Sequence, residues 1–140
     1  MAFQPTPTPS KDLKDIVKRF SEEAWVKGNP DIIDEILSHD FIYHDPAMPA
    51  IDNRELYKRG IISAHSLFKN IQYEIKDMIM EGEKIAVRYI FSADYKVGRV
   101  SHDGIAIYLF ANNCVMELWD FWDAAGLKQQ RLNIDKQIEL

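Results

Sequence analysis

The sequence from Ile71 to Phe91 is IQYEIKDMIMEGEKIAVRYIF, and its pattern decides the fold class. Apolar and polar residues alternate over residues 71–80, which predicts a β-strand, because successive side chains of a strand point to opposite faces. Glu81-Gly82-Glu83 predicts a turn, and residues 85–91 predict a second strand. Residues 105–110 and 115–122 predict two more strands, so we expect an antiparallel sheet in the second half of the chain.

The first half of the chain has helical spacing instead. Apolar residues recur every three or four positions between Ser10 and Gly28, then over a short segment at residues 32–37, and again over residues 56–68, which follow a cap at Asp52 or Asn53. A short β-prone run, residues 41–44, follows the second helix. Helices followed by strands predict an α+β fold in which N-terminal helices cover one face of a curved, cone-shaped sheet with a pocket at its open end.

Composition narrows the class of protein. The chain has 140 residues, 46% hydrophobic and 28% charged, which predicts one globular domain over residues 10–140 after a Pro/Thr tail at residues 1–9. Its net charge of −5 argues against nucleic acid as a partner. The N-terminus lacks the pattern of a signal peptide, and no apolar run reaches the length of a membrane span, so we expect a cytoplasmic protein without membrane contact.

The densest group of candidate functional residues is the run ELWDFWD, from Glu117 to Asp123. On a strand, Glu117, Trp119, Phe121 and Asp123 share one face, and Leu118, Asp120 and Trp122 share the other. Burying an unpaired carboxylate is costly and raises its pKa, which suits a general acid or base. The alternatives are that Asp123 caps the following helix and that Glu117 and Asp120 face solvent.

His44, before Asp45-Pro46, is the second candidate, because it can hydrogen-bond a bound carbonyl group. A hydrogen bond to the loop backbone explains it equally well. Arg88 can bind an anion or pair on the sheet surface, and His102, in a polar turn, is expected to be exposed. A metal would require His44, Asp45, Asp120 and Asp123 to converge, and the sequence contains no local His pair, so we expect no metal site. Cys114 has no basic neighbour in sequence, which disfavours a nucleophilic role.

The chain resembles the SnoaL-like polyketide cyclases of the nuclear transport factor 2-like superfamily over roughly residues 13–130. The resemblance is carried by four segments in the family's order: FSEEAWVKGNPD at 20–31, FIYHDP at 41–46, EGEKIAVRY at 81–89 and ELWDFWDAAGLKQQ at 117–130. It implies an α+β cone, a homodimer, a pocket for a small hydrophobic molecule, and acid/base chemistry without metal or cofactor.

The resemblance also implies the site residues. Family members place a catalytic Asp near the end of the last strand, which corresponds first to Asp123 and second to Asp120, while His44 and Trp119 match a family histidine and tryptophan. We therefore expect Asp123, His44 and Asp120 to be catalytic. The predicted ligand-binding residues are Trp119, Phe121, Trp122, Tyr43, Glu117 and Arg88.

Three functions follow as hypotheses. The first is a cofactor-independent cyclase or isomerase, of the lyase or isomerase class, in which a carboxylate acts on an enolisable hydrophobic substrate. Epoxide hydrolysis is a variant that needs an Asp-Arg-Asp arrangement, for which Arg88 is the candidate arginine. The second is a non-catalytic small-molecule-binding or dimerisation module, and the third a subunit of a larger assembly.

Overall fold

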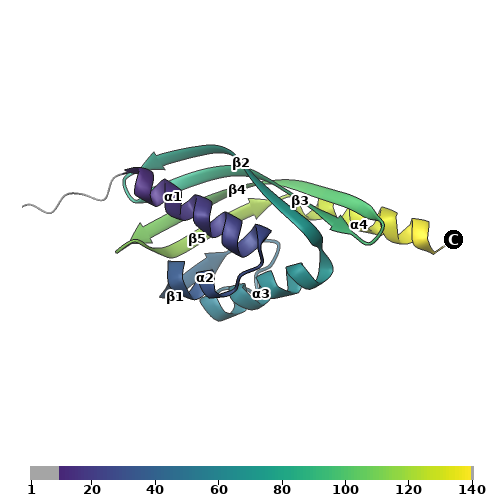
Figure 1. Cartoon of the computed structure of the whole chain (residues 1–140), viewed down its shortest axis with the longest axis horizontal. Coiled ribbons are helices and arrows are strands. Elements are labelled where there is room, and N and C mark those ends of the chain that lie inside the picture. Colours follow the sequence, from purple (N-terminus) through teal and green to yellow (C-terminus); the bar gives the residue numbers. More distant parts are fainter. Residues whose placement is uncertain (1–9, 140) are drawn as a thin grey trace, which may run out of the picture.

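The computed structural model describes residues 10–139, with side chains from Leu13 onward, and combines five helices with a five-stranded sheet (Figure 1). The tail predicted at residues 1–9 lies outside the described residues. The helices are α1 (Ser10–Phe20), the π-helix η1 (Ser21–Val26), α2 (Asp31–Ile36), α3 (Arg54–Leu67) and α4 (Ala124–Ile138). The strands are β1 (Leu37–His44), β2 (Lys69–Glu81), β3 (Lys84–Tyr95), β4 (Gly98–Ala111) and β5 (Cys114–Trp122).

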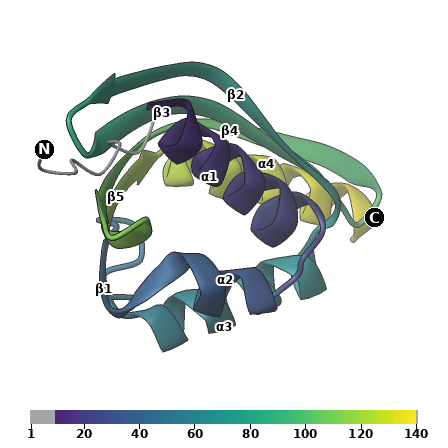
Figure 2. The ribbon, with the colours of Figure 1, turned by 60° about the vertical axis from the view of Figure 1, so that its left-hand side comes forward.

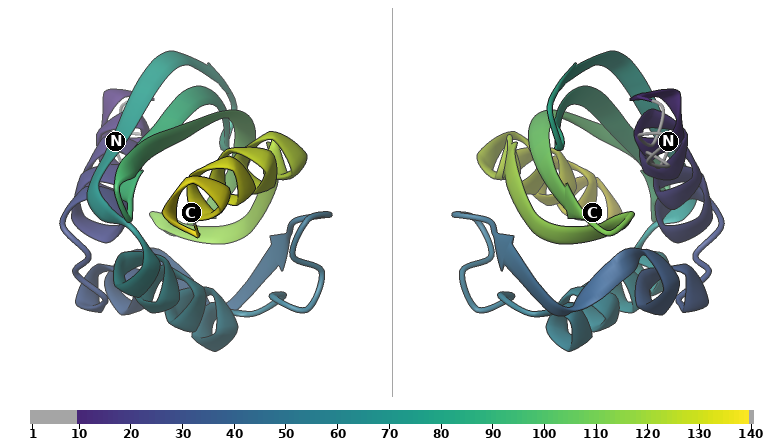
Figure 3. Two further views of the ribbon diagram at one scale, coloured as in Figure 1. Left: turned by 90° about the vertical axis from the view of Figure 1, so that its right-hand side faces the viewer. Right: turned by 90° about the vertical axis from the view of Figure 1, so that its left-hand side faces the viewer.

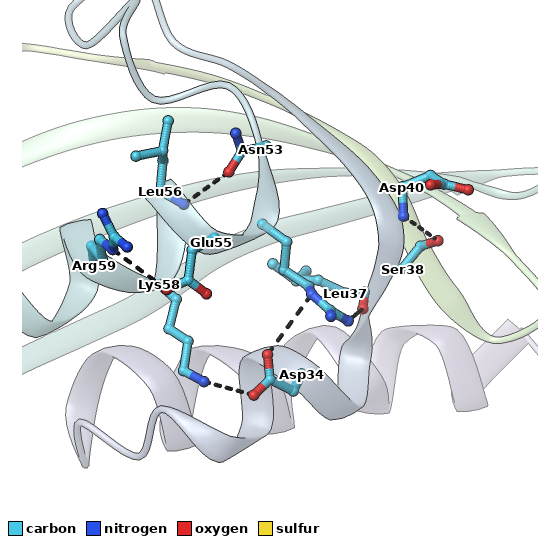
Figure 4. Close-up of polar contacts among 10 residues, drawn as sticks. Asp34, Leu37, Ser38, Asp40, Asn53, Glu55, Leu56, Lys58 and Arg59 are labelled. Atoms are coloured by element: carbon cyan, nitrogen blue, oxygen red, sulfur yellow. Dashed lines mark hydrogen bonds and ion pairs between the residues drawn. The ribbon is translucent and has the colours of Figure 1, made fainter.

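The helix boundaries follow local chemistry. The π-helix η1, which continues α1, ends at Val26, and Gly28 just beyond it adopts a positive φ of 69°, a conformation that glycine accepts without strain. Of the two cap candidates for α3, Asn53 is the cap, since its Oδ1 accepts a hydrogen bond from the Leu56 amide at 2.9 Å (Figure 4). The same view shows the ion pair between Lys58 of α3 and Asp34 of α2, which joins the two helices; its Nζ–Oδ2 distance is 2.6 Å.

The sheet has the strand order β1-β5-β4-β3-β2. Strands β2 to β5 pair antiparallel, as predicted, but β1 pairs parallel to β5, so the sheet is mixed and not purely antiparallel. A second correction concerns residues 98–104, because the sequence predicted a polar turn around His102 and a strand only from residue 105. They are the first half of β4, and the turn before it is only Lys96-Val97. The helix expected after Asp123 is α4, which extends to Ile138.

The sheet curves strongly, and the helices close its concave side (Figure 2). Views along the cone show α4 lying within the curve of the sheet (Figure 3). Alternate residues of β3 face inward and are buried: Ile85, Val87, Tyr89, Phe91, Ala93 and Tyr95. The α+β cone predicted from the sequence is therefore confirmed, with the core between the inner face of the sheet and the helices.

Within residues 10–139, no helix combines the length and the apolar character that crossing a membrane requires.

Candidate functional site

A cavity of about 500 Å³ lies between the sheet and the helices. That volume lies within the range of small-molecule sites, which are mostly apolar with a few polar groups that orient the ligand. Its walls come mainly from side chains of α3 and the loop before it, with others from the sheet and α4. The charged or titratable side chains among them, other than tyrosines, are Asp45, Arg59, His102, Asp120 and Arg131.

Asp120 reaches the cavity because of the register of β5. Leu118, Asp120 and Trp122 lie on the inner face of the strand, where Leu118 packs into the core and the other two line the cavity. Asp120 pairs with Ala106 of β4 across the sheet. The grouping of residues predicted from the strand period is therefore confirmed, and the face that carries Asp120 is the inner one.

Two tyrosine hydroxyls hold the Asp120 carboxylate. Tyr89 donates to its Oδ1 at 2.8 Å, and the Tyr43 hydroxyl lies 3.0 Å from its Oδ2. Burial raises the pKa of Asp120 to about 6, the two tyrosine hydrogen bonds oppose that shift, and the nearby Asp45 carboxylate adds to it. Because a general base works best when its pKa lies near the operating pH, this carboxylate is suited to accept and return a proton near neutrality.

Tyr43 links Asp120 to a second carboxylate. Its hydroxyl lies 3.0 Å from Asp45 Oδ2 as well as 3.0 Å from Asp120 Oδ2. Burial raises the pKa of Tyr43 far above its ordinary value, so the hydroxyl keeps its proton. One hydroxyl proton serves only one carboxylate at a time. When Asp120 is protonated it donates to the Tyr43 oxygen, and Tyr43 then donates to Asp45.

Asp45 is the most buried carboxylate of the site, with 6% of its surface exposed. Besides Tyr43, it accepts hydrogen bonds from Trp122 Nε1 at 2.9 Å and from the Ala47 amide at 2.9 Å. Trp122 and Ala47 donate to this buried carboxylate in either state, and Tyr43 is a third donor when its proton is not on Asp120. Asp45 therefore fixes both Tyr43 and Trp122 at the end of the cavity that contains Asp120.

His102, expected in an exposed turn, instead lines the cavity. It lies on β4, half-buried, and stacks on Phe91 with ring centroids 4.9 Å apart and packs against Trp122 at 4.7 Å. Burial lowers the pKa of His102, which favours the neutral ring at pH 7. Nδ1 lies 3.2 Å from the Asp103 carbonyl, to which it donates, so Nε2 of the neutral ring is an acceptor.

The structure places Asp123, the first choice for a catalytic base, outside the cavity. The residue is exposed at the end of β5, and its Oδ1 accepts a hydrogen bond from the Gly126 amide at 2.9 Å. Asp123 is thus the N-cap of α4, which is the alternative that the sequence left open. This placement corrects the expectation that Asp123 faces a bound substrate.

Five further predicted residues lie on the outer face of the sheet. His44 Nε2 lies 2.7 Å from Glu117 Oε2, and its ring stacks on Trp119 with centroids 5.2 Å apart. Phe121 is 56% exposed, and Arg88 Nε pairs with Asp77 at 2.6 Å on the same side. None of the five lines the cavity, because the strand period turns them away from Asp120. This corrects their assignment to the pocket.

Of the predicted residues, the structure thus brings Tyr43, Asp120 and Trp122 together in the cavity. Tyr89 and His102 were missed, and Asp45 was considered only as a possible metal ligand. His102 shares a strand face with Gly104, Ala106 and Tyr108, which are buried. This period indicated that His102 points inward, but the polar residues around it were interpreted as a turn. Tyr89 and Asp45 belonged to segments already recognised, and no local signal marked them as neighbours of Asp120.

Comparisons with known proteins agree with this architecture. The family model of the SnoaL-like polyketide cyclases matches residues 15–131, and the chain belongs to that family. None of the curated proteins compared with the chain matches it significantly. Among solved structures, a candidate polyketide cyclase from Acidithiobacillus ferrooxidans superposes with a TM-score of 0.80 at 21% identity, over 90% of this chain and 98% of its own.

Two other solved structures show the range of proteins with this fold. A Catenulispora acidiphila protein with a ketosteroid isomerase-like fold, crystallised with trimethylamine, has a TM-score of 0.74 at 15% identity, over 84% of this chain and 92% of its own. An LEH-like epoxide hydrolase from M. tuberculosis has a TM-score of 0.73 at 12% identity, over 88% of this chain and 91% of its own. At these identities the likeness shows the fold alone.

Proposed function

We propose that this protein is a cofactor-independent cyclase or isomerase that uses Asp120 as a general base on an enolisable, largely apolar substrate. The observation that carries the proposal is the position of Asp120: a carboxylate with a pKa near 6, held by Tyr43 and Tyr89 at the wall of an aromatic cavity. Membership of the SnoaL-like family supports the same reaction class.

The proposed reaction begins with the ionised Asp120 removing a proton from a carbon next to a carbonyl group. The electrons of that C–H bond form the enolate C=C bond, and the carbonyl π electrons move to oxygen. In a cyclase, the enolate carbon then attacks a second carbonyl of the same molecule, and Asp120 returns its proton to the new alkoxide. The product is an isomer of the substrate, so the reaction consumes neither oxidant nor reductant.

The tyrosines have distinct parts in this proposal. Tyr89 and Tyr43 stabilise the ionised form of Asp120, which keeps its pKa from rising further. When Asp120 takes the proton, the Tyr43 hydroxyl turns to Asp45, which leaves the protonated carboxyl with an acceptor. Asp45 is therefore a positioning residue, and Asp120 is the catalytic one.

Epoxide hydrolysis is not favoured, although one structural neighbour is named as an epoxide hydrolase. Epoxide hydrolysis, as considered from the sequence, needs an arginine between two carboxylates. Arg88 pairs with Asp77 on the outer face and does not line the cavity. Asp45 and Asp120 are bridged by a tyrosine instead.

The test is hydrogen–deuterium exchange at the α-carbon of simple enolisable compounds, such as 2-tetralone and ethyl acetoacetate, followed by NMR in D₂O. We expect the protein to accelerate exchange above buffer, with a rate that rises through pH 6 as Asp120 ionises. Asp120→Asn, which retains size and hydrogen-bonding oxygen, should reduce the acceleration at least 100-fold, in the usual range of a general base.

Asp123→Asn is the informative comparison, because it removes the same charge three residues away. If that variant loses exchange and Asp120→Asn does not, the base has been assigned to the wrong carboxylate. If no enolisable compound exchanges faster, yet apolar ligands bind the cavity, the non-catalytic binding module becomes the better description of this protein.

We further propose that the protein forms a homodimer through the outer face of its sheet. Ile42, Ile105, Ile107, Trp119 and Phe121 form an outer apolar patch on β1, β4 and β5, in which Ile105 pairs with Phe121 and Ile107 with Trp119 across the sheet. Contiguous exposed apolar surface of this kind marks interaction sites, and a second copy presents a matching patch.

Light scattering at 1–100 µM tests this assembly. We expect a dimer, and we expect Phe121→Glu to convert it to a monomer, because the charge would be buried in the interface. Ile79→Glu is the matched control, since Ile79 is 69% exposed on β2 and outside the outer apolar patch. A wild-type monomer at 100 µM contradicts the proposal.

A further inference from the structure

Arg131 places a positive charge against the aromatic wall of the cavity. The residue lies on α4 and lines the cavity. Its guanidinium carbon is 5.0 Å from the centre of the Tyr95 ring and 5.9 Å from that of Phe68. Stacking on two aromatic rings fixes the planar group and removes part of its hydration.

The cation is incompletely paired inside the protein. Arg131 Nε is buried and has no hydrogen-bond partner among the residues that the structure describes. Asp135 lies one turn further along α4, and its pKa is lowered first by the hydrogen bonds from Lys96 and Tyr95, with Arg131 as the smallest contribution. The Asp135 carboxylate, however, binds Lys96 Nζ at 2.7 Å and the Tyr95 hydroxyl at 2.9 Å. Because Nε is buried even when the cavity is empty, a ligand there would contact the terminal guanidinium nitrogens of Arg131 and not Nε.

The polar groups of the cavity have opposite charges at its two ends. Tyr89 and Tyr95 lie on the same face of β3, six residues and therefore roughly 20 Å apart along the strand. Tyr89 holds Asp120 at one end, and Tyr95 contacts Arg131 at the other. Phe91, between them, stacks on His102 and also contacts Phe68. An extended aromatic wall thus connects a negative end to a positive end.

We infer that the ligand of this cavity is an apolar, ring-bearing molecule with an anionic group, such as a carboxylate, which Arg131 binds. The inference rests on the proposed function, since it names the substrate class of the same cavity. A guanidinium matches the geometry of carboxylate and sulfonate oxygens, and the aromatic wall accommodates the ring. Repulsion from Asp45 and Asp120 keeps the anionic group away from the base, so the enolisable end of the substrate faces Asp120.

A matched pair of fluorescent probes tests the inference without knowledge of the substrate. 1-Anilinonaphthalene-8-sulfonate and N-phenyl-1-naphthylamine share one ring system, and only the first carries a negative charge. We expect the wild-type protein to bind both and to prefer the anionic probe. Arg131→Met should lower the affinity for the anionic probe 10- to 100-fold, the usual effect of losing one charge-assisted contact, and change the affinity for the neutral probe less than twofold.

Arg99→Met controls for net charge, because Arg99 pairs with Asp94 at 2.8 Å outside the cavity, and it should change neither affinity. Urea unfolding of each variant confirms that the fold is intact. If Arg131→Met lowers the affinity for both probes equally, Arg131 only shapes the cavity wall. If neither affinity changes, Arg131 does not contact the probes. Both results overturn the anionic anchor and leave the Asp120 proposal standing, whereas a wild-type protein that binds neither probe argues against both.

Discussion

Replacing Asp120 by Asn should stabilise the protein at neutral pH, and the gain should grow as the pH rises. The folded state holds Asp120 at a pKa of about 6, above its ordinary value near 3.8. Between these values the folded chain binds a proton that the unfolded chain has released. The free energy of unfolding therefore falls as the pH rises from about 4 through 6, and the stability that Asp120 contributes in its protonated form is lost.

The magnitude follows from the shift. Roughly two pKa units at about 1.4 kcal/mol each correspond to about 3 kcal/mol. Asp120 borders a cavity that water can enter, so solvent screening reduces the figure, and we expect about 2 kcal/mol between pH 4 and pH 8. Asn has the same shape as Asp and no charge to desolvate, so the unfolding free energy of Asp120→Asn lacks this component of the pH dependence.

The assay is urea unfolding of both proteins at several pH values over that interval. The difference in unfolding free energy between Asp120→Asn and wild type isolates Asp120, because the other titrating groups contribute equally to both. Asp123→Asn controls for loss of one negative charge. A difference that is constant with pH, or that moves in favour of the wild type as the pH rises, would refute the argument that burial dominates over the tyrosine hydrogen bonds.

Three further substitutions test the geometry of the site. Tyr43→Phe removes a hydrogen bond that favours the ionised form of Asp120, so the pKa of Asp120 should rise above 6 and its NMR carboxyl titration should move to higher pH. Gly104→Ala should lower the free energy of unfolding, measured in urea, by about 1–3 kcal/mol and displace Tyr89, because a Cβ at position 104 would overlap the Tyr89 ring. Asp123→Ala should cost about 1 kcal/mol of unfolding free energy through loss of the α4 cap, and an unchanged urea midpoint would contradict that role.

Much of the architecture could be predicted from periodicity alone. The change from helical spacing to alternation near Ile71 indicated the α+β class, and the strand period separated Asp120 and Trp122 from Glu117, Trp119 and Phe121. These features are local, because backbone geometry sets the period of a strand or helix wherever the segment lies. The Asn53 cap belongs to the same class, since a cap bonds an amide only three residues away.

The site required the three-dimensional arrangement. Periodicity separates two faces of a strand, but the curvature of the sheet and the helices packed against it decide which face is inside, and with it the choice between Asp120 and Asp123. Tyr43, Tyr89 and Asp120 come from three strands, up to 77 residues apart in sequence. Their hydrogen bonds depend on the register between β1, β3 and β5, and the raised pKa of Asp120 depends on desolvation by side chains from across the whole cavity. Neither register nor desolvation is a property of a single segment, so both arise only when the chain folds.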